Sequence, residues 1–235
     1  MPPDPRLDVP GFTVDHATTA EVERQAALYG PLADAVRGLA DASIRTEVDD
    51  DEIRAVQAEV EALTARLRSR QLDGPYGARF GADGRGRNWG NAVVGLRNPV
   101  APPLTIERDP SANGDVWSDF HLGAAYEGPP TLVHGGVSAL ILDQLLGESA
   151  GARGRPGMTG TLTLRYRRPT PLGDLRAEAR IDRVEGIKTY ATGHIIGPDG
   201  VTVEAEGVFI LPRWARSEES PGTPKPDPAS STAHD

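Results

Sequence analysis

The chain has 235 residues, 38% hydrophobic and 25% charged, which is enough for one substantial domain with appendages or two small domains. Its formal net charge of −9 repels a phosphate backbone and argues against broad nucleic-acid binding. The sequence contains no cysteine, which excludes disulfides, thiolate nucleophiles and Cys-based metal sites.

The two ends of the chain have few apolar residues. Residues 1–15 are rich in Pro and Asp, and residues 214–235 form a polar tail, so we expect both to be disordered. The opening MPPDPRLDVPGF lacks the basic start and apolar core of a signal peptide. No apolar run approaches the roughly 20 residues that span a bilayer. We therefore expect a cytoplasmic protein with neither a membrane nor a nucleic acid as partner.

Two helices are predicted in a helical extension over residues 16–72. Thr18 and Glu21 have capping-box spacing, and Pro31 marks a kink or a fresh helix start. A second helix follows an acidic cluster, and its apolar residues recur at steps of three and four: Ile53, Val56, Val60, Leu63 and Leu67. The stripe is compatible with a coiled coil or a dimer contact. Because two heptads are few, we expect the helix to pack on its own domain.

Residues 73–102 are predicted to be a Gly-rich basic linker. Its GRGRNWG stretch superficially resembles a nucleotide-binding glycine loop, but no strand precedes it and the spacing differs. Residues 103–213 then change to short strands: PLTIER, DVWSDFHLG, TGTLTLRYRR, DLRAEARIDRV, IKTYATGHII and VTVEAEGVFIL. Short turns such as GPDG indicate antiparallel pairing. We predict an α+β fold in which this sheet wraps around one apolar helix.

That helix lies in the stretch EGPPTLVHGGVSALILDQLLG, residues 127–147. Gly135 and Gly136 open it with helix-start N–H groups that a ligand oxygen can approach, because no Cβ blocks the way. The helix dipole adds positive potential there, so the sequence predicts an oxyanion hole. His134 is more typical of a residue that fixes the loop by a hydrogen bond than of a base. Diglycines also serve close packing alone, so a purely structural role stays open.

Asp143 lies seven residues after Gly136 on the same helix face, about 10 Å along the axis. It is surrounded in sequence by Leu and Ile, and we expect desolvation to raise its pKa, which suits a base that activates water. Direct attack on an acyl group, giving an anhydride, is the alternative catalytic role, and a buried Asp can also cap a loop or pair with Arg. With no second His or acid nearby, no metal site is predicted. Ser138 lacks a G-x-S-x-G elbow, which argues against a serine hydrolase.

The stretch YEGPPTLVHGGVSALILDQLLG resembles the HGG-to-Asp helix of PaaI-like hotdog-fold acyl-CoA thioesterases. The similarity continues through MTGTLTLRYRRPTPLGD, VEGIK and EAEGVFILPR, and it covers about residues 103–213. It is closest to the branch with the mammalian mitochondrial long-chain members. The resemblance implies a hotdog fold and hydrolysis of a medium- or long-chain acyl-CoA in fatty acid metabolism. It also implies a homodimer or dimer of dimers, with sheets joined edge to edge and active sites at the junction.

The resemblance also assigns roles to residues. Gly136, with or without Gly135, polarises the thioester carbonyl, His134 orients the loop, and Asp143 is base or nucleophile. Thr159, sixteen residues after Asp143, completes the site from the other subunit. No cofactor is implied, because CoA is part of the substrate.

Two further positions bear on the substrate. Phenylacetate-pathway relatives carry an Asn where this chain has Gly128, which weakens any prediction of an aryl-acyl substrate. An acidic protein needs a local cationic patch to hold the phosphates of CoA, and the candidates are Arg167, Arg168 and Lys188. These three residues are equally consistent with solvated strand ends.

Two other functions fit the same fold. A non-catalytic acyl-CoA-binding or regulatory protein would bind the ligand without releasing thiol. Hydration of enoyl-CoA uses an Asp and a nearby His in a loop whose motif the sequence lacks.

Overall fold

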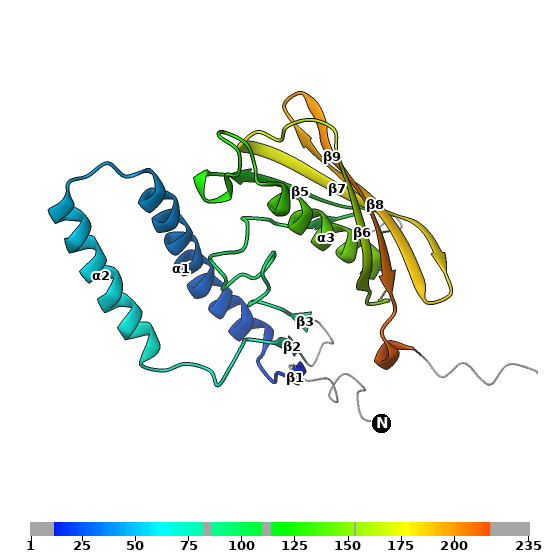
Figure 1. Ribbon diagram of the computed structural model, residues 1–235. Coiled ribbons are helices and arrows are strands. Elements are labelled where there is room, and N and C mark those ends of the chain that lie inside the picture. The colour runs from blue at the N-terminus through cyan, green and yellow to red at the C-terminus, as the bar shows by residue number, and fades with distance from the viewer. Residues whose placement is uncertain (1–11, 82–85, 110–113, 153, 217–235) are drawn as a thin grey trace, which may run out of the picture.

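The structure, a computed structural model, describes residues 12–81, 86–109, 114–152 and 154–216. The predicted disorder of residues 1–11 and 217–235 therefore lies outside the described residues. Figure 1 shows a curved sheet with one helix along its concave face, and a helical extension on the other side of that helix. This arrangement confirms the predicted α+β hotdog architecture.

The sheet has six antiparallel strands in the order β4-β5-β7-β8-β9-β6. Its strands are β4 (Glu107–Arg108), β5 (Val116–Leu122), β6 (Met158–Tyr166), β7 (Gly173–Glu185), β8 (Lys188–Gly197) and β9 (Gly200–Ile210). The predicted strand PLTIER is ordered as a strand only over its last two residues. The other predicted strands are confirmed, and β6 ends the sheet with one edge unpaired in the described chain.

The central helix α3 (Gly135–Gly151) buries one side against the sheet. Four large apolar side chains of that side are fully buried: Ile141, Leu142, Leu145 and Leu146. Gly193 and Gly207 of the sheet lie beneath Leu146, and a Cβ at either position would come within about 3 Å of its methyl groups. These glycines therefore let the helix sit close to the sheet.

The other side of α3 is not covered by the sheet. Gly136 and Leu140 are exposed there and Asp143 is half-buried, all within two helical turns of one another. The expectation of a helix wrapped on nearly all sides is thus only partly right for the single chain, because this side stays open. The functional residues lie along it.

A bulge in β6 changes the direction in which its first residues point. The register with β9 shifts between Thr159 and Thr161, so that Thr159 pairs with Phe209 while Leu162 pairs with Gly207. Phe209 is buried under α3, so Thr159 lies on the α3 side of the sheet. Strict alternation from Leu162 would have placed Thr159 on the outer face. Gly160 is the extra residue of this bulge.

The helical extension contains α1 (Thr19–Arg45) and α2 (Asp50–Arg68). Thr18 caps α1 by accepting from the Glu21 N–H at 3.2 Å, and Asp49 caps α2 by accepting from the Asp51 and Glu52 N–H groups. Both predicted helices are confirmed. Pro31 lies inside α1 without ending it, because the helix runs on to Arg45.

Two predicted unstructured segments contain strands. β1 (Phe12–Val14) falls in the segment predicted to be disordered, and β2 (Ala78–Phe80) and β3 (Gly86–Arg87) fall in the predicted linker. Aromatic contacts hold this small sheet, since the Phe12 ring packs edge-on against Phe80 and against Trp214. Trp214 lies in the short 3-10 helix η3 (Arg213–Ala215), so the predicted disorder of residues 214–235 is also wrong at its first residues. Both predictions were therefore wrong at these residues, because propensity did not register the aromatic contacts between distant segments.

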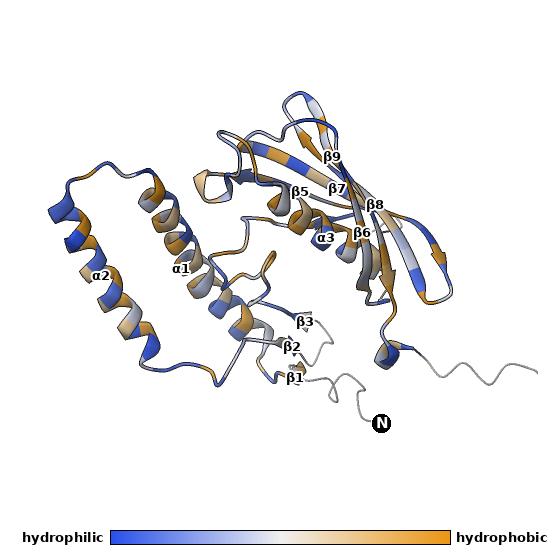
Figure 2. Ribbon diagram, in the orientation of Figure 1, coloured by the Kyte–Doolittle hydropathy of each residue, from blue (hydrophilic) through white to orange (hydrophobic). Residues whose placement is uncertain are grey.

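α1 and α2 differ in how they meet the rest of the chain. On α1, the Arg37 Nε donates to the Ala101 carbonyl at 3.1 Å, and Asp41 accepts from the Ala124 N–H at 3.0 Å. α2 lies beyond α1, away from the sheet, and none of its residues is buried (Figure 1). The prediction that α2 packs on its own domain is wrong, and the apolar stripe stays exposed along it (Figure 2).

Candidate active site

His134 caps the start of α3 with its own ring. Its Nδ1 accepts a hydrogen bond from the Gly136 N–H at 2.9 Å, and its carbonyl accepts from the Val137 and Ser138 N–H groups. Because Nδ1 is the acceptor, the proton of the neutral ring is on Nε2. His134 is itself exposed, so this Nε2–H is open to a ligand. The structure thus places the ring against the helix start, as a residue that fixes this loop.

The same contact distinguishes the two glycine amides. The Gly136 N–H, which the resemblance named first as the oxyanion donor, is held by the His134 ring. For the Gly135 N–H, the part of the chain that the structure describes offers no acceptor. Gly135 is therefore the amide that a ligand oxygen can take directly, and Gly136 becomes available only if the ring moves.

The loop before the helix has little freedom. Glu127 and Val133 form a bridge, and the Glu127 carboxylate accepts from the Thr131 N–H at 2.6 Å. Gly128 packs on His134 so closely that a Cβ there would lie 2.7 Å from the His134 Cα. An Asn at this position would therefore displace His134 from the place it has here. This close packing fits the Gly that this chain has where phenylacetate-pathway relatives carry an Asn.

Tyr166 is a site residue that sequence reasoning did not single out. Its hydroxyl donates to the Gly135 carbonyl at 2.9 Å, from the last residue of β6. The alternation of β6 placed Tyr166 on the same face as Leu162 and Leu164, which was a signal that it points toward α3. The bond ties the end of the edge strand to the first residue of the helix.

Asp143 and Thr159 form the second half of the site. The Thr159 hydroxyl donates to the Asp143 Oδ1 at 2.8 Å, within one chain. The bulge at Gly160 brings Thr159 to Asp143 of its own chain, so the two residues enter the site together, and the expectation that they act with the helix start of the other subunit stays a prediction. The expectation of an Asp buried among Leu and Ile is corrected. Those side chains turn to the sheet, and Asp143 is half-buried on the open side.

The two halves do not meet at one atom. Gly136 and Asp143 are seven residues apart in a helix, so about 10 Å separates them along the axis. A single small group cannot touch both within one chain. The site is therefore either occupied by a ligand that lies along the helix or completed by a second chain.

The three cations proposed for CoA lie at two different ends of the sheet. Arg167 follows the end of β6 and pairs with Glu204 at 2.8 Å, and Arg168 donates to the Asp199 carbonyl. Lys188 aligns with Ile210, which pairs with Met158 at the opposite end of β6. Eight residues of strand, or about 26 Å, therefore separate Lys188 from the Arg167 end. Within one chain the three do not form one patch.

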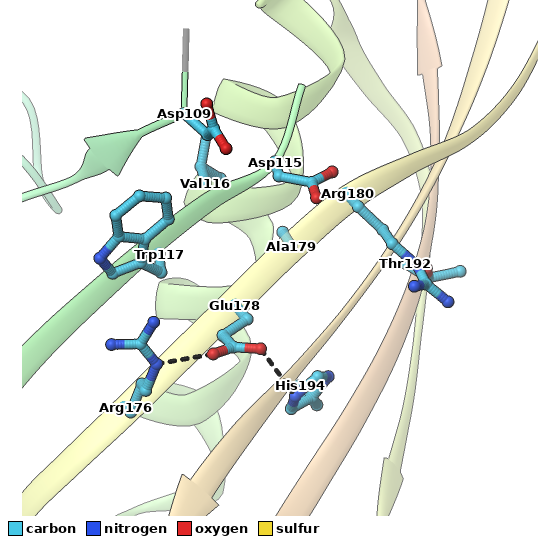
Figure 3. A pocket seen from close by; sticks show the side chains of 10 residues that line it. All are labelled: Asp109, Asp115, Val116, Trp117, Arg176, Glu178, Ala179, Arg180, Thr192 and His194. Carbon is cyan, nitrogen blue, oxygen red and sulfur yellow. Dashed lines mark hydrogen bonds and ion pairs between the residues drawn. The ribbon is translucent and has the colours of Figure 1, made fainter. Parts of the chain in front are cut away.

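A polar hollow on the convex face of the sheet is remote from this site. Figure 3 shows it in front of β5 and β7, with α3 behind the strands. Three of its polar side chains contact one another, since Arg176 and His194 both contact the Glu178 carboxylate. It is a network of ion pairs on the outer face of the sheet and shares no residue with the Asp143 side of α3.

Over the four described ranges, no group of three or more His, Cys, Asp or Glu side chains is arranged to hold a metal ion. Nor does any helix in those ranges have the length and apolar character that crossing a membrane requires.

Comparisons with known proteins give the family context. The family model described as thioesterase superfamily matches residues 131–204. A crystal structure of a thioesterase superfamily protein has 32% sequence identity and a TM-score of 0.68, and the alignment covers 84% of this chain and 98% of the other.

Curated relatives match over a shorter region. An acyl-coenzyme A thioesterase THEM4 of Xenopus laevis is 33% identical over 94 residues, which are 39% of this chain and 42% of that protein. A THEM5 acyl-coenzyme A thioesterase of Homo sapiens is 29% identical over 103 residues, 43% of this chain and 42% of that protein. The chain thus spans less than half the length of these two relatives.

Proposed function

Because this chain belongs to the thioesterase superfamily, we propose that it hydrolyses a medium- or long-chain acyl-CoA to a free acid and CoA. The observation that carries the proposal is the order of groups along the open side of α3. Helix-start amides come first, an apolar Leu140 follows, and the Asp143–Thr159 pair comes last. The relatives named acyl-coenzyme A thioesterases support the substrate class.

In the proposed reaction the thioester oxygen accepts a hydrogen bond from the Gly135 N–H, where the helix dipole favours negative charge. Asp143 of a second chain, which the β6 pairing described below brings close to this amide, takes a proton from water, and the water oxygen bonds to the carbonyl carbon. The C–S bond then breaks, and the sulfur leaves with its electron pair and takes up the proton. Thr159 holds the carboxylate in one orientation. No cofactor is needed, because water is the only co-reactant.

Asp143 as a nucleophile is the alternative route, in which its oxygen bonds to the acyl carbon, the C–S bond breaks and CoA leaves, and water then hydrolyses the mixed anhydride that remains. Many turnovers in ¹⁸O-labelled water, followed by mass spectrometry of the protein, detect an anhydride that water opens at the aspartyl carbon. Label in the Asp143 peptide identifies the anhydride, since water then attacks the aspartyl carbon. With Asp143 as base, the label enters only the product acid.

We also propose that two chains complete each site by pairing their β6 strands. β6 is the edge of the sheet, and its outer backbone groups have no strand partner in the described chain. If the nine residues of β6 pair antiparallel with the same strand of a second copy, the centre falls at Leu162. Thr159 of one chain then lies beside the end of β6 that carries Tyr166 in the other. This pairing brings the Asp143–Thr159 pair close to the other chain's helix-start amides.

The same pairing bears on the CoA phosphates. It places Lys188 of one chain at the end of the paired strands where the other chain has Arg167 and Arg168. The three cations then lie around one junction, although they are far apart within a chain. We propose that this junction, rather than either end alone, holds the phosphates.

A thiol-release assay over a chain-length series tests the proposed function. We expect the wild-type protein to release CoA from medium- or long-chain acyl-CoA, and Asp143→Asn to lose at least 100-fold in kcat while staying folded by circular dichroism. Asp73→Asn, a change of the same kind at an exposed position, is the matched control and should keep full activity. Equal rates for Asp143→Asn and wild type would remove Asp143 from the mechanism.

Two further readouts complete the test. Binding of acyl-CoA by calorimetry without any thiol release would replace the proposal by a non-catalytic acyl-CoA-binding role. Mass measurement by light scattering tests the β6 pairing, because a protein that stays a single chain while it hydrolyses acyl-CoA contradicts the shared site.

A further inference from the structure

An apolar pocket of about 360 Å³ lies between the helical extension and the central helix. Its walls include Val36 and Ala40 of α1, Val100 of the loop before β4, and Val137 and Leu140 of α3. This volume is within the range of small-molecule sites. Resting on the proposed function, we propose that the pocket holds the acyl chain of the substrate and that α1 sets which chain lengths fit.

The position of Leu140 connects the pocket to the reacting groups. Leu140 lies one helical turn after Gly136 and just under one turn before Asp143, on the open side of α3. Its side chain is 38% exposed, which is unusual for a Leu next to the start of a buried helix. A thioester carbonyl at the Gly135 N–H therefore has its acyl chain beside Val137 and Leu140, at the mouth of the pocket.

The wall that α1 supplies is fixed by hydrogen bonds to the hotdog domain. The Ala101 carbonyl accepts from the Arg37 Nε at 3.1 Å and from the Tyr126 hydroxyl at 3.3 Å. Burial raises the pKa of Tyr126, so its hydroxyl stays protonated and can donate. The Arg37 guanidinium also contacts Asp34 at 2.5 Å. The one charged side chain of the pocket wall is thus engaged by a carbonyl and a carboxylate, and what faces the pocket is mainly apolar.

A filling substitution tests the acyl pocket. Ala40→Phe adds a ring to the α1 wall, and Ala35→Phe places the same ring on α1 outside the pocket. Each methylene that loses burial lowers affinity about fourfold. We expect Ala40→Phe to lower kcat/KM for dodecanoyl-CoA at least tenfold and to change kcat/KM for acetyl-CoA less than twofold. Ala35→Phe should have the wild-type kcat/KM for both substrates.

Binding gives a second measurement that does not depend on hydrolysis. We expect Ala40→Phe to weaken the binding of dodecyl-CoA thioether at least tenfold by calorimetry, with ethyl-CoA thioether unchanged. If the wild-type protein releases no thiol, the proposed function is wrong. The binding of the two thioethers still tests whether the acyl chain occupies the pocket. An unchanged dodecyl-to-ethyl ratio in Ala40→Phe overturns the acyl-pocket inference, even if the wild type is an active thioesterase.

A separate observation concerns α2. Leu63 and Leu67 are 51% and 56% exposed, and they belong to the apolar stripe that begins at Ile53. A helix of 19 residues with such a stripe and no buried residue is unstable without a partner. We infer that α2 packs antiparallel against α2 of a second copy of this chain, centred at Val60.

Charge supports this partner and this orientation. The start of α2 carries Asp50, Asp51 and Glu52, and its end carries Arg66 and Arg68. Antiparallel pairing places each acidic start beside a basic end, at the cost of bringing Glu59 and Glu61 of the two chains together around Val60, whereas parallel pairing sets the two acidic starts side by side. The steps of three and four in the stripe are those of a two-stranded seam. Because the interface is the same on both chains, it closes after one contact and links two chains or two β6-paired dimers.

Light scattering of paired variants tests the α2 contact. We expect Val60→Glu, in the stripe, to halve the mass of the wild-type assembly, and Ala58→Glu, outside the stripe on the same helix, to leave it unchanged. Circular dichroism checks that the rest of the chain stays folded. An unchanged mass for Val60→Glu, or a wild type that is already a single chain, overturns the α2 inference. Cross-linking of Cys introduced at Val60, which should join two copies, is the positive test.

Discussion

The Thr159 hydroxyl donates to the Asp143 carboxylate across 2.8 Å, between an edge strand and the central helix of the same chain. A bulge at Gly160 makes this contact possible by turning Thr159 toward α3. The carboxylate is held on the open side of the helix, where water and a ligand can reach it.

Thr159→Val tests what the hydrogen bond does. The substitution keeps the branched shape but removes the donor, so the carboxylate loses its fixed orientation. We expect kcat for acyl-CoA to fall roughly tenfold, which corresponds to about 1.4 kcal/mol. Thr159→Ser keeps the hydroxyl and should retain most of the rate. Similar rates for the Val and Ser variants would show that the bond does not matter to the reaction.

His134→Ala tests the cap on α3. The change removes the Nδ1 acceptor from the Gly136 N–H, and losing a cap costs about 1 kcal/mol in the free energy of unfolding. Urea denaturation measures this loss. His134→Asn offers an oxygen acceptor at a similar reach and should recover most of the stability. If the Ala variant unfolds at the same urea concentration as wild type, the ring does not serve as a cap.

Deletion of Gly160 tests the bulge. Because Gly160 is the extra residue of the bulge, its deletion leaves Thr159 opposite Phe209 on the α3 side, and most of the thiol release should be retained. Gly160→Ala keeps the chain length and is the control. Its Cβ would lie 3.0 Å from the Ile210 side chain, so we expect a small loss of stability but retained activity. A fall to the level of Thr159→Val in the deletion variant would contradict the assignment of Gly160 as the extra residue.

Thr131→Asn tests strain in the loop before the helix. Thr131 has a φ of 67°, a conformation that β-branched residues rarely adopt and Asn tolerates. We expect the Asn variant to raise the free energy of unfolding by about 0.5–1 kcal/mol in urea denaturation. Thr131→Val keeps the branching and should bring no gain. A destabilised Asn variant would indicate that the Thr side chain offsets the strain by a contact of its own.

The hotdog domain was predictable because its signals are local. The alternation of β7 and the apolar run of α3 follow directly from which faces are buried, and in the helical extension the Thr18 cap follows from side-chain chemistry. The HGG-to-Asp spacing then placed His134 and Asp143 on one helix. Their order along the helix was therefore readable before any fold was known.

The remaining features depend on contacts that spacing does not encode. The bulge at Gly160 is a change of register between two strands, so strict alternation along β6 cannot predict that Thr159 faces α3. The small sheet of the extension forms because Phe12 and Trp214, distant in the sequence, meet. Which glycine amide is free for a ligand depends on the rotamer of His134, because its ring accepts from the Gly136 N–H and not from Gly135. The order of residues does not determine this rotamer.

The ring of His134 has a consequence for the unliganded protein. Because its Nδ1 accepts from the Gly136 N–H, this amide at the start of α3 has a hydrogen-bond partner before any ligand binds. A carbonyl oxygen that binds the Gly136 N–H replaces the His134 nitrogen as the acceptor, so one hydrogen bond is exchanged for another. A ligand oxygen can therefore bind the Gly136 N–H once the His134 ring rotates away, and no water has to be removed from that amide.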